Sequence, residues 1–169
     1  GKYKVVVPGK FRTCEVKVGH HIAPHSSQLP AFIERFESFY SPTEAANASK
    51  LRRIISIAAS HHRLAWIHPF LDGNGRVVRL YSDAMFMFEH LNADGLWSIS
   101  RGLARTKESY HSKLANADLE RLSNYDGRGN LSNKHLVEFC KYFLETAIDQ
   151  VEYMYKMVDT EAMLERIEK

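Results

Sequence analysis

Apolar side chains recur at intervals of three and four residues from Leu29 onward, and this periodicity constrains the fold more than any other feature. Phe32, Ile33, Phe36 and Phe39 show it clearly. Spacing of this kind gives a helix one apolar face that must be covered by a partner. We therefore predict an all-α helical bundle, apart from one short β-hairpin near the N-terminus.

Prolines, glycines and polar clusters divide the helical region into segments. Pro42 and Pro69 end the first two helices, because the residue before a proline is pushed out of the α region. The second helix is expected to turn one set of side chains inward: Leu51, Ile54, Ile55, Ala58 and Ala59. The expected helices cover residues 29–40, 44–66, 74–91, two stretches within 98–123, and a last stretch from after Ser132 to at least Val158.

The first 24 residues follow a different pattern. Val5–Val7 form a short apolar run, and Cys14–Val18 alternates apolar with polar side chains, which indicates strands. Gly19 is the expected turn residue. This segment predicts the hairpin.

Size and charge limit the class of protein. The chain has 169 residues, 44% of them hydrophobic and 25% charged, with a net charge of +3. These values predict one domain over residues 1–169 and argue against nucleic acid as a partner. No run approaches the ~20 apolar residues needed to span a membrane, and no signal peptide opens the chain. We expect a cytoplasmic protein with reduced Cys14 and Cys140, and the start at Gly1 suggests a fragment of a longer chain.

The run from His68 to Arg79 carries the chemistry. Gly73 and Gly75 free the backbone for close approach to a ligand, and Asn74 between them is a good N-cap for the helix that follows. Unpaired N–H groups at the start of a helix, together with the helix dipole, attract phosphate. We expect an anion site there.

The charged side chains of the run suit the same ligand. Arg76 and Arg79 share one helix face, and the guanidinium fork matches phosphate oxygens. Asp72 precedes the glycines, where a carboxylate beside polyphosphate can hold Mg²⁺. His68 is the one base in the run that titrates near neutral pH. This set fits phosphoryl or nucleotidyl transfer.

The run His-Pro-Phe-Leu-Asp-Gly-Asn-Gly-Arg-Val-Val-Arg resembles the signature of the Fic family at every specified position. Pro8–Arg12 and Val16–Gly19 are similar to the family's flap hairpin and its lead-in, and most of residues 8–120 follow the family. The resemblance places the flap at about residues 8–25 and the catalytic loop and helix at residues 68–92. It implies a Fic catalytic domain that moves AMP from ATP to a Tyr, Thr or Ser hydroxyl of a target protein, with Mg²⁺.

The resemblance also implies a role for each matching residue. His68 would deprotonate the target hydroxyl, Asp72 would hold Mg²⁺, and Phe70 would point into the core and pin the loop. The anion hole would be formed by Gly73, Asn74 and Gly75, and the β- and γ-phosphates would be bound by Arg76 and Arg79. The flap residues Val16, Lys17 and Val18 would clamp the target by strand addition. Tyr110 and Leu114 resemble a Tyr-Tyr-x-x-Leu pattern beside the adenine, with His111 in place of the second tyrosine.

Other activities remain open at this point. The same scaffold could transfer UMP, phosphate or phosphocholine, or remove AMP, and a non-catalytic binding or toxin–antitoxin module is a third alternative. The zinc-protease and P-loop patterns are absent from the sequence. His20, His21 and His25 are expected to be exposed loop residues, and His62 is expected to be buried and hydrogen-bonded.

Regulation is suggested by a missing motif. Fic proteins are commonly restrained by a helix with Ser/Thr-x-x-x-Glu followed by Gly or Asn, whose glutamate pairs with the second motif arginine, here Arg79. No glutamate of this chain is followed by glycine or asparagine. We expect the inhibitory helix in missing N-terminal sequence or in a partner chain. The alternative is a glutamate from residues 161–169 that folds back onto Arg79.

Overall fold

The computed structural model describes residues 6–19, 21–43, 47–92 and 95–158. The order of elements is β1 (Lys17–Val18), β2 (His21–Ile22), a 3₁₀ turn η1 (Ser26–Gln28), α1 (Leu29–Tyr40), α2 (Lys50–Ile67), α3 (Asn74–Phe88), α4 (Ile99–Arg105), α5 (Lys107–Asn116) and α6 (Asn133–Val158). The chain is mostly helical, with one antiparallel two-stranded hairpin, as predicted.

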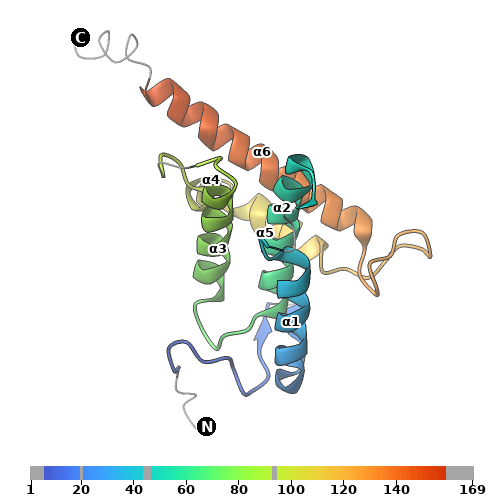
Figure 1. Cartoon of the computed structure of the whole chain (residues 1–169). Coiled ribbons are helices and arrows are strands. Elements are labelled where there is room, and N and C mark those ends of the chain that lie inside the picture. Colours follow the sequence, from blue (N-terminus) through green and yellow to red (C-terminus); the bar gives the residue numbers. More distant parts are fainter. Residues whose placement is uncertain (1–5, 20, 44–46, 93–94, 159–169) are drawn as a thin grey trace.

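Helix α2 is the centre of the bundle and contacts α1, α3 and α6. Its C-terminal half is buried around its circumference, at positions that include Ile57, His61, His62 and Ile67. Helix α6 lies across α2 and α4, and its C-terminal end projects beyond the bundle (Figure 1). The long central helix therefore fixes the position of the loop that begins after Ile67.

Two clusters of apolar side chains form the core. The larger one joins α2, α3, α4, α5 and α6 around Phe86, Phe139 and Phe143. The smaller one joins α1, α2 and α3 around Leu29 and Ile67. Helices α4 and α6 cross closely at Gly102, where an added Cβ would lie 2.5 Å from Cγ2 of Thr146. Glycine is needed there for space, not for backbone freedom.

Several predicted boundaries are wrong. Helix α2 begins at Lys50, because the Ser49 hydroxyl caps it by accepting from the Arg52 N–H at 3.3 Å; residues 44–46 lie outside the described part. Helix α3 ends at Phe88, three residues earlier than predicted, and α5 ends at Asn116. The prediction extends the second of the two helical stretches within residues 98–123 beyond Asn116.

Two inward assignments are also wrong. Leu51 is 68% exposed and Ile55 is 44% exposed, because the first turns of α2 reach the bundle surface. The predicted strand at Val5–Val7 is absent at Val6 and Val7, and Val5 lies outside the described residues. The hairpin is confirmed further along, with Gly19 in its turn at φ +60°.

No described helix is long and apolar enough to cross a membrane. Cys14 is half-buried and Cys140 is buried, and neither forms a disulfide.

Candidate active site

His68 ends α2 in a left-handed backbone conformation, with φ 51° and ψ 60°. This region is uncommon for a residue with a side chain and is retained only where the surroundings enforce it. Here the His68 N–H donates to the carbonyl oxygen of Leu64 at 3.1 Å, which closes the last turn of the helix. The chain then turns sharply at Pro69 toward the glycine-rich loop.

Arg12 enforces this turn from the opposite side. Its guanidinium is buried and donates from Nε to the carbonyl oxygen of His68 at 2.8 Å and from Nη1 to that of Cys14 at 3.0 Å. Nη2 donates to the carbonyl of Pro24, and the backbone N–H of Arg12 donates to Pro69 at 2.9 Å. One side chain therefore ties both ends of the flap segment to the backbone of His68.

The side chain of Asn74 closes the loop. Its Oδ1 accepts from the Phe70 N–H at 2.9 Å, and its Nδ2 donates to the Phe70 carbonyl at 2.8 Å. The predicted N-cap role is wrong: Gly73, at φ +84°, is the cap residue, and Asn74 is the first residue of α3, 4% exposed. Its amide is fully engaged across the loop, which gives the loop a defined shape.

Phe70 lies near the start of this loop, directly after Pro69. Its ring packs against Phe11 with centroids 5.6 Å apart, and it is only half-buried, so it pins the loop to the flap lead-in without entering either core cluster.

The N-terminus of α3 offers free backbone donors. The Gly73 N–H is used by Oδ1 of Asp72 at 2.6 Å, whereas the N–H groups of Asn74 and Gly75 have no hydrogen-bond partner among the described residues. These groups sit at the positive end of a 15-residue helix. The geometry suits an anion.

The two arginines of the run lie over the glycines. A Cβ on Gly73 would lie 3.4 Å from Nη2 of Arg76, and one on Gly75 would lie 3.3 Å from Nη1 of Arg79. The Arg76 side chain is 72% exposed and approaches Oδ2 of Asp72, itself 71% exposed, at 3.5 Å. An exposed pair of this kind contributes little stability, so both side chains can be recruited by a ligand.

The environment of His68 favours its neutral form. Burial lowers the pKa of the imidazole, and the positive charges of His21 and Arg12 lower it further, while a backbone contact with Ala65 opposes the shift. The imidazole is therefore unprotonated at neutral pH. This is the form a general base requires.

Tyr110 and Leu114 are placed on α5, against the larger core cluster. Tyr110 is 7% exposed, and its hydroxyl lies 2.9 Å from Nε2 of His61, whose Nδ1 lies 2.8 Å from the Ser82 hydroxyl. Burial raises the pKa of Tyr110 to about 12 and lowers the pKa of His61 to about 3, so the phenol donates to a neutral imidazole. The Tyr110 hydroxyl thus already has a structural partner.

The flap residues lie at the hairpin. Lys17 pairs with Ile22, and Val18 pairs with His21. Because the Ala23 N–H donates to the Val16 carbonyl at 3.4 Å, Val16–Ala23 is a hydrogen-bonded pair, and so is Val18–His21 by alternation. The backbone groups of Lys17 therefore point away from β2, along the open edge of the hairpin.

Sequence reasoning missed three residues that hold this region together: Arg12, His21 and Asp118. His21 is not an exposed loop residue as predicted, since its side chain is 14% exposed. His62 is buried and bonded to Asp118 at 2.8 Å, as predicted. Asp118 lies 50 residues from His68 along the chain, and no local pattern marks it.

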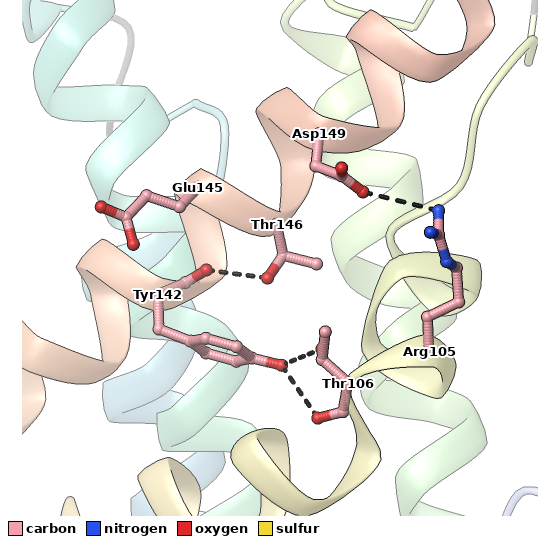
Figure 2. A pocket seen from close by; sticks show the side chains of 6 residues that line it. All are labelled: Arg105, Thr106, Tyr142, Glu145, Thr146 and Asp149. Carbon is pink, nitrogen blue, oxygen red and sulfur yellow. Dashed lines mark hydrogen bonds and ion pairs between the residues drawn. The ribbon is translucent and has the colours of Figure 1, made fainter.

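Two hollows of the surface can be described by their lining residues. One of about 290 Å³ lies between α6 and the junction of α4 and α5, where Tyr142 reaches Thr106 and Asp149 faces Arg105 (Figure 2). A second of about 290 Å³ touches Pro69 and Phe70 from behind the loop. Gly73, Asn74 and Gly75 line neither hollow, and the side chains of Asp72 and Arg76 beside them are exposed.

Arg79 has no ion pair with a carboxylate among the described residues. The alternative partner in residues 161–169 lies outside the described part. No group of three or more His, Cys, Asp or Glu side chains able to hold a metal occurs among the described residues.

The helical bundle, the flap hairpin and the glycine-rich loop at a helix N-terminus together define a class of proteins, and a family model identifies that class. The Fic/DOC family model matches residues 1–86, and the chain belongs to this family.

Curated relatives match one part of the chain. Protein adenylyltransferase Fic of Drosophila virilis is 37% identical over 79 residues, which are 47% of this chain and 16% of the relative. The homologue from Drosophila melanogaster is 38% identical over 79 residues, 47% of this chain and 15% of the relative. The chain thus matches about one sixth of the length of these relatives.

Two solved structures have a similar fold over most of this chain. A Fic family protein from Desulfovibrio desulfuricans G20 superposes with a TM-score of 0.64 and 21% identity, covering 95% of this chain and 44% of that one. A Fic domain containing signaling protein from Bacteroides thetaiotaomicron VPI-5482 gives a TM-score of 0.62 and 23% identity, covering 88% and 55%. At this identity the likeness shows the fold alone.

Proposed function

We propose that the chain transfers AMP from ATP to a hydroxyl of a target protein. One observation carries the proposal: residues 68–79 fold as a single loop and helix start, with a half-buried histidine at one end and free N–H groups between two arginines at the other. A base close to an anion site is the minimum that nucleotidyl transfer requires. The relatives named protein adenylyltransferase Fic support AMP as the transferred group.

In this reaction His68 accepts the proton of a Tyr, Thr or Ser hydroxyl. The hydroxyl oxygen attacks the α-phosphorus of ATP, the bond to the bridging oxygen breaks, and pyrophosphate leaves. The lowered pKa of His68 keeps its nitrogen free to take the proton at neutral pH. The hydrogen bond from Arg12 to the His68 carbonyl oxygen would fix the backbone that carries the ring.

The phosphates would bind at the start of α3. The unpaired N–H groups of Asn74 and Gly75, with Gly73 before them, would form the anion hole. Arg76 and Arg79 would neutralise the β- and γ-phosphates from either side of the glycines. The closeness of both guanidinium groups to these glycines supports this role.

Asp72 fits a magnesium ion that is held chiefly by the nucleotide. Mg²⁺ is commonly bound by one or two carboxylates, several waters and substrate phosphates. A single exposed carboxylate next to the anion site matches that pattern. The ion would neutralise part of the negative charge of the phosphates.

The adenine and the target would occupy the two remaining sides. We propose that Tyr110 and Leu114 lie on the adenine side. The contact from Tyr110 would be made by its ring, because its hydroxyl is hydrogen-bonded to His61. The target segment would add to the open edge at Lys17, with Val16 and Val18 flanking it. Transfer of UMP, phosphate or phosphocholine, removal of AMP, and a non-catalytic toxin–antitoxin or binding role are the alternatives.

Inhibition would come from missing N-terminal sequence or from a partner chain, and a glutamate of residues 161–169, outside the described part, is the alternative. A carboxylate supplied to Arg79 would compete with the γ-phosphate. The described residues place no carboxylate there.

Labelled ATP tests the proposal. The chain is incubated with Mg²⁺ and a cell extract, and the label is placed on either the α- or the γ-phosphate. We expect protein-bound label from α-labelled ATP alone, an adduct with the mass of one adenylyl group, and no label with His68→Ala. Label from γ-labelled ATP would assign a kinase, and no label from either would leave a binding module.

A further inference from the structure

His21 lies on the inner face of the hairpin, between the flap and the body of the protein. Its Nδ1 is 3.1 Å from Oδ2 of Asp118, and its Nε2 is 2.8 Å from the carbonyl oxygen of Trp66, two residues before His68. Trp66 belongs to α2, and Asp118 follows α5. One ring therefore joins β2 to two separate parts of the bundle.

Both partners of His21 are acceptors. A carbonyl oxygen cannot donate, and the pKa of Asp118, against the effect of burial, is lowered to about 2 by hydrogen bonds from His21 and His62, so its carboxylate is ionised. Each nitrogen of His21 must therefore carry a proton for both bonds to exist. The geometry requires an imidazolium.

We infer that His21 is a positioning residue that donates from both ring nitrogens and so clamps the flap hairpin onto Asp118 and the backbone next to His68. The inference rests on the proposed function only for its consequence, which is that the clamp presents the flap edge beside the base. The clamp itself is a property of the folded chain.

The charges around His21 agree with this state. Burial lowers the pKa of His21, but the hydrogen bond and charge of Asp118 and the bond to Trp66 outweigh it, so the pKa is raised overall despite Arg12. Burial lowers the pKa values of two other histidines of this region, His68 and His62, and the charge of Arg128 lowers that of His62 further. His21 is thus the histidine of this group whose pKa is raised, in agreement with its two donated hydrogen bonds.

The sign of the pH dependence follows. A group whose pKa is raised by folding adds stability that is fully present below its unfolded pKa and is lost as the pH rises through the folded pKa. While Asp118 is ionised, the clamp is therefore closed below the His21 pKa and loosens as the pH rises through that pKa. Burial lowers the pKa of His68, and the charge of His21 lowers it further, so loss of His21 should let the pKa of His68 rise.

Nuclear magnetic resonance of the whole chain tests the clamp without ATP or a target. The ¹⁵N shifts of the histidine rings are followed from pH 5 to pH 9 in the unmodified chain, His21→Ala, Asp118→Asn and the control His25→Ala. His25 is an exposed histidine four residues away that pairs with Glu15. Hydrogen–deuterium exchange of residues 14–24 is measured on the same samples.

We expect His21 to carry protons on both nitrogens at pH 7 and to titrate above 6.5. Asp118→Asn should lower the pKa of His21. His21→Ala should raise the pKa of His68 and speed hydrogen–deuterium exchange of residues 14–24 about 10-fold. His25→Ala should do neither. A singly protonated His21 at pH 7, or a titration unchanged by Asp118→Asn, would overturn the inference.

The two proposals fail separately. If Asp118→Asn does not fold, because His62 also loses a partner, His21→Ala still decides through the titration of His68 and the exchange of the hairpin. A chain with the clamp but no transfer would remove the proposed function alone, and transfer without the clamp would remove only this inference.

Discussion

The Nε atom of Arg12 donates to the carbonyl oxygen of His68 at 2.8 Å, across 56 residues of sequence. The same guanidinium holds the carbonyls of Cys14 and Pro24, which lie before and after the hairpin. The flap and the candidate base are therefore positioned by one buried side chain. A disturbance of the flap lead-in should be felt at His68.

Arg12→Lys tests this coupling. A lysine carries one nitrogen and cannot reach three carbonyls in a fixed fork, so the free energy of unfolding should fall by about 2–3 kcal/mol and transfer should drop. ATP affinity should hardly change, since the anion site is elsewhere. Urea unfolding and calorimetry measure the two effects. Arg35→Lys, at an exposed arginine of α1, is the matched control. A similar loss of stability and transfer in that variant would argue against a specific role for Arg12.

His68→Ala should abolish transfer and leave ATP binding intact, because the base acts on the attacking hydroxyl. Loss of a positioned base costs about 10²–10⁴ in rate. In the unmodified chain the acid limb of the rate should have its midpoint below pH 6.5, since the pKa of His68 is lowered and the neutral form persists into mild acid. A midpoint well above pH 6.5 would show that another group limits the rate.

The anion site is tested by two substitutions that should differ in their response to magnesium. Asp72→Ala should make ATP affinity insensitive to Mg²⁺ and remove activity. Arg76→Ala should weaken ATP binding with and without Mg²⁺, because its charge meets phosphate directly. Titration calorimetry separates them. Unchanged affinity in both variants would place the nucleotide elsewhere.

The register of the hairpin selects the residue that tests strand addition. The N–H of Lys17 points to the open edge, whereas that of Val18 faces β2. Lys17→Pro should remove the outward donor and reduce target modification while the hairpin persists. Val18→Pro should break the hairpin itself. Lys17→Ala, which keeps the N–H, is the control, and equal losses in Lys17→Ala and Lys17→Pro would point to the side chain instead.

Tyr110→Phe separates a structural role from a nucleotide role. Removal of the hydroxyl leaves Nε2 of His61 buried without its donor, which should cost about 1–2 kcal/mol of unfolding free energy. The ring remains, so ATP affinity should be unchanged. Tyr125→Phe, at a fully exposed tyrosine, should leave stability unchanged. A large loss of ATP affinity in Tyr110→Phe would show that the hydroxyl contacts the nucleotide.

The sequence alone determined the helical class, the hairpin turn at Gly19 and the run 68–79. Helical periodicity and turn chemistry are local, and a loop between a proline and a glycine pair leaves few conformations. The grouping of free N–H groups and arginines at the start of α3 was predictable for the same reason, since these residues are adjacent in the chain, while anion binding there stays a prediction. The N-cap role of Asn74 was predicted wrongly, because its side-chain amide hydrogen-bonds to the backbone N–H and carbonyl of Phe70 instead of capping α3.

The tertiary structure decided what holds the site in place. Arg12 reaches His68 over 56 residues, and Asp118 meets His62 over the same separation and His21 on the flap. Whether Leu51 or Ile57 is buried likewise depends on where α1, α3 and α6 cross α2. Contacts between distant segments leave no periodic trace in sequence, because each depends on the packing of whole helices rather than on neighbours along the chain.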